Sequence, residues 1–73
     1  MREIQTGKKY MHFKGNVYTV IAIGHHSETK EKLVIYENSK SEIWVRPYEM
    51  FNSPVDKEKY PEVEQYYRFE EID

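Results

Sequence analysis

Five side chains of types that often bind ligands lie in the middle of the chain. They are His26, Glu28, Tyr36, Trp44 and Arg46. Trp44 and Arg46 are two residues apart, so on a strand they share one face. Arginine stacks on aromatic rings and offers a planar fork to a carboxylate or a phosphate. If Tyr36 lies beside them on a neighbouring strand, the three side chains form a platform for an anion, a base or a peptide.

Both Trp44 and Arg46 also have a purely structural explanation. Trp44 can pack in a small second core, because a short chain has few large apolar side chains to spare. Arg46 can form an ion pair with Glu28 or Glu37, since arginine is seldom buried without a partner. The sequence leaves the binding and the structural interpretations open.

Metal binding or acid–base catalysis would need histidines and carboxylates to converge. His25 and His26 are neighbours, and neighbours on a strand point to opposite faces, so they cannot easily share a metal ion. His26 and Glu28, with His12 brought near by a hairpin, form a conceivable metal or acid–base set. Their spacing matches no specific motif, and the sequence contains no glycine-rich phosphate loop. We therefore expect no catalytic residues, no metal site and no cofactor.

A basic patch near the N-terminus suggests an alternative, binding of RNA or single-stranded DNA. Its members are Lys8, Lys9, His12 and Lys14. The net charge is −2, and residues 49–73 carry three Lys or Arg against eight Asp or Glu. A nucleic-acid binder needs a concentrated basic face, so the acidic second half argues against this class. Nucleic-acid binding stays the second hypothesis, after a small non-catalytic binding module.

Four or five short strands must position these residues. β-branched and aromatic residues predict strands over 8–13, 17–26, 33–37, 42–46 and 66–72. Lys14-Gly15-Asn16 suits a tight hairpin turn, because glycine and asparagine tolerate positive φ. The second strand is apolar on both faces, which predicts a central, curved strand with a bend at Gly24. A helix from Val63 onward stays an alternative to the last strand.

The fourth predicted strand is followed by a change of structure. Pro47 stops it, because proline has no N–H to donate to a ladder. Residues 48–51 predict a single helical turn, with Met50 and Phe51 as plugs for the end of a barrel. Residues 52–62 contain two prolines and several charges, which predicts an acidic loop.

The size and composition of the chain favour one mostly β domain over residues 1–73, a small SH3-like barrel or roll with one helical turn before the last strand. The absence of cysteine excludes disulfides and suits a reducing cytoplasm. No signal peptide is evident, and the apolar stretch 20–23 is too short to span a bilayer. We expect a soluble cytoplasmic protein without a membrane partner, either a monomer or a homodimer paired through an exposed strand edge.

Several strings of residues are distinctive in type and spacing. They are Tyr10-Met-His-Phe-Lys-Gly-Asn-Val-Tyr18, His26-Ser-Glu-Thr29, Leu33-Val-Ile-Tyr36, Trp44-Val-Arg-Pro-x-x-Met-Phe51 and Arg68-Phe69. Together they resemble a bacterial family known as domain of unknown function sixteen-fifty-three, most strongly over residues 7–51. The resemblance implies an SH3-like barrel in small cytoplasmic bacterial proteins, and it implies no activity. Residues 52–66 are longer and more acidic here than in many relatives, so a ligand framed by them is expected to differ.

The family's motif falls on a mixture of structural and polar positions. They are His12, Lys14, Gly15, Tyr18, His26, Glu28, Tyr36, Trp44, Arg46, Pro47, Met50 and Phe51. Turn, core and strand-stop roles account for several of them, but not for His26, Glu28, Trp44 and Arg46. We therefore expect a binding module that recognises a protein, a peptide or a small anionic ligand through these four side chains and Tyr36.

Overall fold

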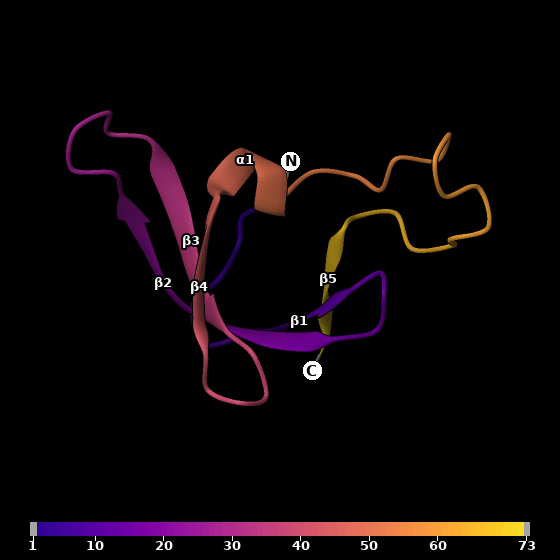
Figure 1. The fold of residues 1–73 in the computed structure, drawn as a ribbon, viewed down its shortest axis with the longest axis horizontal. Helices are drawn as coiled ribbons and strands as arrows, with labels where there is room; N and C mark the ends of the chain where they lie inside the picture. The colour runs from indigo at the N-terminus through magenta and orange to yellow at the C-terminus, as the bar shows by residue number, and fades with distance from the viewer. Residues whose placement is uncertain (1, 73) are drawn as a thin grey trace.

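Residues 2–72, which the computed structural model describes, contain five antiparallel strands in one sheet, in the order β4-β3-β2-β1-β5 (Figure 1). The elements are β1 (Lys9–His12), β2 (Val17–His25), β3 (Lys32–Glu37), β4 (Ile43–Pro47), helix α1 (Tyr48–Phe51) and β5 (Phe69–Ile72). This confirms the prediction of a mostly β domain with one helical turn before the last strand. The alternative helix from Val63 onward is wrong.

The predicted strand ends lie within one residue of the observed ones, except that β5 begins at Phe69. Pro47 was expected to stop β4, yet it is the last residue of that strand and pairs with Leu33. A proline is tolerated there because β4 is an edge strand, where an N–H that faces solvent can be lost without cost to the ladder.

β2 is the central strand, as predicted, with β1 on one side and β3 on the other. Its register against β3 shifts between Val20 and Ala22, which leaves Ile21 as an extra residue. Such a bulge reverses the alternation of faces, so Val20 and Ile23 both pair with inward-facing residues of β3. This shift explains why β2 is apolar on both faces. The irregularity lies at Ile21, three residues before the bend expected at Gly24.

Aromatic rings fill the inside of the sheet. Phe51 and Phe69 stack with ring centroids 4.0 Å apart and an angle of 8° between their planes. Tyr36 packs edge-on against them, at 5.3 Å from Phe51 and 5.8 Å from Phe69. β3 and β5 are separated by two strands in the sheet, yet their rings meet. The sheet is therefore curled into a roll around this cluster.

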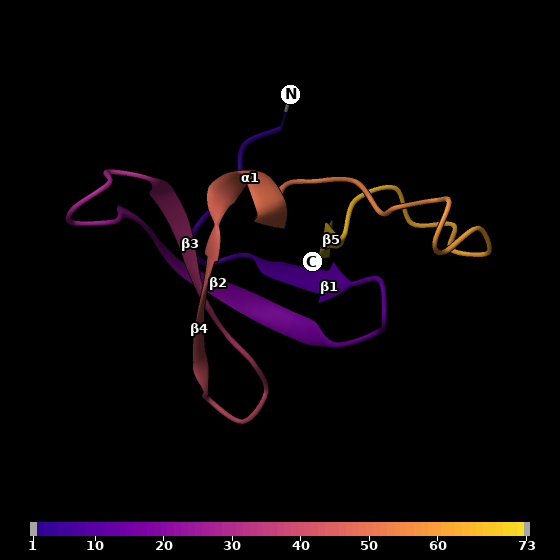
Figure 2. The ribbon, with the colours of Figure 1, turned by 45° about the horizontal axis from the view of Figure 1, so that its top comes forward.

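Helix α1 closes one end of the roll, next to the N-terminal segment (Figure 2). Phe51 is fully buried, which confirms its role as a plug. Met50 is 48% exposed, so its prediction as a second plug is wrong, because neighbouring residues of a helical turn point in different directions. The backbone N–H of Ile4 donates to the Tyr48 hydroxyl at 2.8 Å and fixes the N-terminal segment to α1. Within residues 2–72, no helix has the length and apolar character that a membrane span requires.

Candidate functional site

Residues 52–68, between α1 and β5, fold back on themselves and form an arm at one end of the molecule (Figures 1 and 2). The backbone N–H of Val55 donates to the backbone carbonyl oxygen of Tyr66 at 2.8 Å. The backbone N–H of Arg68 donates to the backbone carbonyl oxygen of Ser53 at 3.0 Å. Val55 is only 4% exposed. The segment 52–62, predicted as an acidic loop, is thus held by backbone hydrogen bonds and by the buried side chain of Val55.

The arm is fastened to the β1–β2 hairpin. Nε2 of Gln65 donates to the backbone oxygens of Met11 at 2.9 Å and Arg68 at 3.3 Å. The N–H of Phe13 donates to the oxygen of Arg68 at 2.9 Å. The rings of Phe13 and Tyr60 lie 4.9 Å apart, centroid to centroid. These contacts hold side chains of the arm beside the hairpin turn.

Replacing Gln65 with alanine is expected to loosen the arm. The change removes hydrogen bonds worth about 1 kcal/mol each, so the arm should open more often. Hydrogen exchange at the Phe13 amide, which donates to Arg68, should become faster. Gln5→Ala is the control, since Gln5 is an exposed residue outside the arm. If hydrogen exchange at the Phe13 amide is unchanged in Gln65→Ala, the side-chain amide of Gln65 does not hold the arm.

A pocket of about 310 Å³ lies between the hairpin and the arm, and we call it the basic pocket. It is lined by His12, Phe13, Lys14, Arg46, Asp56, Lys59, Tyr60 and Arg68. Two lysines and two arginines face one carboxylate here, so the lining is strongly positive at neutral pH. The volume is at the lower end of the range of small-molecule pockets, roughly 300–1,000 Å³.

The imidazole of His12 adds an uncharged donor to the basic pocket. Its Nδ1 accepts the backbone N–H of Lys14 at 3.1 Å, and its ring stacks on Phe13 at 4.4 Å. Burial, and then the positive charges of Arg46, Lys14 and Arg68, lower the pKa of His12 below its ordinary 6.5. The ring is therefore neutral at pH 7. Since Nδ1 is an acceptor, the proton lies on Nε2, which can donate to a ligand.

Arg46 connects the basic pocket to the aromatic core. Its Nε donates to the Tyr36 hydroxyl at 3.3 Å, and its Cζ lies 5.5 Å from the centre of the Phe69 ring. A guanidinium above a ring is stabilised by a cation–π interaction. These two contacts use one of the five N–H groups and orient the others. Arg46 is thus held in place before any ligand arrives.

The structure brings together only part of the predicted recognition surface. Tyr36 and Arg46 are hydrogen-bonded, and Trp44 pairs with Tyr36 across β3 and β4. The Tyr36 ring, however, is 5% exposed and belongs to the core, so only its hydroxyl reaches Arg46. Trp44 is 50% exposed on the edge strand and does not line the basic pocket. Packing of Trp44 into a second core, the structural alternative, is not observed.

His26 and Glu28 lie in the β2–β3 turn, away from the basic pocket. This turn and the arm are at opposite ends of the molecule in both views (Figures 1 and 2). Nδ1 of His26 accepts the backbone N–H groups of Glu28 at 3.1 Å and Thr29 at 3.3 Å, so the imidazole stabilises the turn. The β2–β3 hairpin places its turn at the end of the molecule opposite to the arm, so the five predicted side chains do not share one surface.

The possible metal set and the basic patch are also divided by the fold. His12 ends β1 and His26 follows β2 at the other end of the molecule. Within the described part of the chain, no three His, Asp or Glu residues gather closely enough to hold a metal ion. Lys9 begins β1, where it pairs with Ile72, three residues from His12 at the other end of the strand. Of the patch residues, only His12 and Lys14 line the basic pocket.

Several pocket residues were not among the sequence candidates. They are Phe13, Asp56, Lys59, Tyr60 and Arg68. Phe13 and Arg68 belong to strings that carry the family resemblance, and these strings are the sequence signal for this region. The other three residues lie in the arm, and nothing in their spacing shows that the arm folds back.

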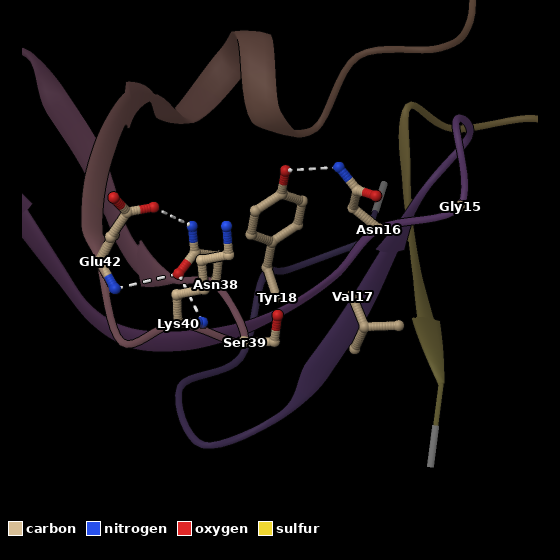
Figure 3. A pocket seen from close by; sticks show the side chains of 8 residues that line it. All are labelled: Gly15, Asn16, Val17, Tyr18, Asn38, Ser39, Lys40 and Glu42. Atoms are coloured by element: carbon tan, nitrogen blue, oxygen red, sulfur yellow. Dashed lines mark hydrogen bonds between the residues drawn. The ribbon is translucent and has the colours of Figure 1, made fainter.

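A larger hollow, of about 540 Å³, lies between the β1–β2 and β3–β4 turns (Figure 3). Its polar groups mostly bind one another. The amide of Asn38 donates to Glu42 at 2.7 Å, and its oxygen accepts the backbone N–H groups of Lys40 and Glu42, each at 2.9 Å. One lysine and one glutamate give this hollow no net charge. We therefore take the basic pocket as the candidate site.

Comparison with known proteins yields a family and no function. No curated protein and no solved structure significantly matches the chain. One family match spans residues 8–71, which include the first hairpin, β4 and the arm. The chain belongs to the DUF1653 family of proteins of unknown function.

Proposed function

We propose that this domain is a non-catalytic binding module that holds a small anionic ligand in the basic pocket. One observation carries the proposal: two lysines and two arginines from three separate segments line a pocket with a single carboxylate. Charge-assisted hydrogen bonds from such groups to an anion are about twice as strong as neutral ones. Bringing like charges together costs free energy, and a bound anion removes that cost.

A small anion fits this pocket better than the other ligand classes considered. A peptide or a protein would need a longer surface, and the basic pocket has only about 310 Å³ between hairpin and arm. Nucleic acid would need a continuous basic face, but Lys8 and Lys9 lie outside the pocket. A phosphate or carboxylate group can be reached from several sides at once, by Lys14, Arg46 and Arg68. Phosphate is the better match, because it offers more acceptor oxygens to converging donors.

Arg68→Gln is expected to weaken the binding of inorganic phosphate at least about tenfold, because one charge-assisted hydrogen bond contributes roughly 1.5–3 kcal/mol. Isothermal titration at low salt measures the change. Lys9→Gln is the matched control, since it removes an exposed positive charge from β1 without touching the basic pocket. An equal loss of phosphate affinity in the two variants would mean that binding depends only on the net charge of the protein, and the proposal would fail. Acetate and sulfate titrations then separate carboxylate from tetrahedral oxyanions.

The free energy of unfolding without ligand is expected to fall as the pH drops below about 6.5, partly through His12. Folding lowers the pKa of His12, so below about pH 6.5 the unfolded chain binds more protons at His12 than the folded chain does. Protonation therefore favours the unfolded state in this range. His12→Asn keeps an acceptor for the Lys14 N–H and removes the titration. Urea unfolding at about pH 7.5 and about pH 5.5 should show a smaller loss in the variant. An equal loss would exclude His12 as a source of the pH dependence.

A further inference from the structure

The outer edge of the sheet is unusually apolar. Three consecutive residues of the edge strand β4 are half-exposed: Ile43 at 55%, Trp44 at 50% and Val45 at 56%. Neighbours on a strand point to opposite faces, so both faces of this edge are apolar. Proteins usually protect an exposed edge with charged residues, a proline or a covering segment. In β4 the charged Arg46 and Pro47 lie at the end of the strand, and the three residues before them carry no charge.

The hydrogen-bond pattern of the β3–β4 hairpin shows which backbone groups are free. The N–H of Asn38 donates to the oxygen of Glu42 at 3.1 Å. Hydrogen-bonded and non-hydrogen-bonded pairs alternate along antiparallel strands, so the next bonded pair is Tyr36 with Trp44. The N–H and C=O groups of Ile43 and Val45 therefore point away from β3, to the open edge.

We propose that two copies of this chain associate through β4, antiparallel, with Trp44 of one copy opposite Trp44 of the other. In this register Ile43 of either copy lies opposite Val45 of the other copy. The N–H and C=O groups that β3 leaves free then bond across the two-fold axis. The two five-stranded sheets become one continuous sheet, and the apolar edge is covered.

The sequence of β4 is complementary to itself in this register. Around Trp44 it reads acidic, apolar, aromatic, apolar, basic, from Glu42 to Arg46. An antiparallel pairing about Trp44 places Glu42 opposite Arg46, and opposite charges across a strand pair are favourable. Within its own copy Arg46 lies over the Phe69 ring and lines the basic pocket.

Other antiparallel registers of β4 against itself match hydrogen-bonding groups and side chains less well. Centring the axis on Val45 sets Ile43 opposite Pro47, which has no N–H, and Trp44 opposite Arg46. Centring it on Ile43 sets Glu42 opposite Trp44. Only the register about Trp44 satisfies the free groups of Ile43 and Val45 and matches both the apolar and the charged side chains. This self-complementarity is the reason to choose a second copy over another partner as the occupant of the edge.

Multi-angle light scattering of the wild-type chain tests the association. The dimer fraction should rise with concentration over roughly 1 µM to 1 mM, as expected for a small edge interface. Val45→Lys places a charge in the interface and should give a monomer. Val17→Lys is the matched control: Val17 is 39% exposed on β2, which β3 separates from β4 in the sheet, and this variant should still dimerise. A wild-type chain that stays monomeric throughout overturns the proposal, even if the edge binds an extended peptide.

The register has its own test. The chain has no cysteine, so Trp44→Cys introduces a single thiol. Opposite residues in a non-hydrogen-bonded pair have Cα atoms about 4.5 Å apart, within the range that a disulfide spans. Under mild oxidation Trp44→Cys should form a disulfide-linked dimer much faster than Val17→Cys. Equal rates would exclude this register. The indole of the wild type, the chain's only tryptophan, should shift its fluorescence to the blue as concentration rises.

The anion pocket and the dimer edge are tested by separate variants. Val45 does not line the basic pocket, so Val45→Lys should bind inorganic phosphate like the wild type. Lost phosphate binding in a folded Arg68→Gln protein that still dimerises would support both proposals together. A monomeric wild type that binds phosphate would remove only the proposed association.

Discussion

Replacing Phe51 with alanine is expected to lower the free energy of unfolding by about 3–5 kcal/mol. The ring is fully buried and stacks on Phe69 at 4.0 Å, with Tyr10 and Tyr36 packed edge-on at 5.5 Å and 5.3 Å. A domain of this size has a total stability of roughly 4–11 kcal/mol. The cavity would therefore remove a large part of it. Urea unfolding followed by circular dichroism measures the loss.

Met50→Ala is the matched control for this prediction. Met50 precedes Phe51 in the same helical turn but is 48% exposed, so its truncation should change stability by about 0.5 kcal/mol or less. Similar losses in both variants would mean that the turn as a whole, rather than the buried ring, holds the end of the roll. That result would contradict the description of Phe51 as the plug.

Arg46→Met is expected to reduce phosphate affinity by at least about tenfold while the protein stays folded. Methionine keeps an unbranched stem over Phe69, and it removes the guanidinium that lines the basic pocket. The Tyr36 hydroxyl loses its bond to Nε, so a modest decrease in melting temperature should accompany the change. Titration calorimetry with inorganic phosphate gives the affinity, and a thermal melt gives the stability.

Lys40→Met serves as the control for Arg46. Lys40 is exposed in the β3–β4 turn and lines the neutral hollow, not the basic pocket. It should leave phosphate affinity unchanged. If Arg46→Met simply unfolds the domain, Arg46 is a structural residue, and its role in the pocket would have to be dropped. A folded Arg46→Met protein with wild-type affinity would contradict the proposed function.

The fold could be predicted where local chemistry decides it. Gly15, at a φ of +102°, forms the first hairpin turn that its residue type predicts. The strand bounds followed from β-branched and aromatic residues, and the helical turn at 48–51 was predicted to the residue. The sequence wrongly predicts Met50 as a plug, because four residues are too few to define a buried face. The bulge at Ile21 was missed because two apolar faces are equally compatible with a curved regular strand.

The site was harder to predict because it depends on long-range contacts. Gln65 joins the arm to β1 across 54 residues of sequence, and no local pattern encodes that contact. Charge and proline content indicate only a loop and do not single out Lys59 or Tyr60. The sequence indicates Arg46 as part of a recognition surface, and in the structure Arg46 contacts Tyr36 and lines the basic pocket, whereas His26, Glu28 and Trp44 do not line it. His26 looked functional from its type, whereas its Nδ1 accepts backbone N–H groups of its own turn.

The central claim, an anion site between the first hairpin and the arm, is tested most directly by nuclear magnetic resonance. The ¹⁵N-labelled wild-type chain is titrated with inorganic phosphate at neutral pH and constant ionic strength. We predict saturable amide shifts confined to residues 12–14, Arg46, 56–60 and Arg68. Shifts that do not saturate, that are absent, or that centre on the β2–β3 turn around His26 would contradict it.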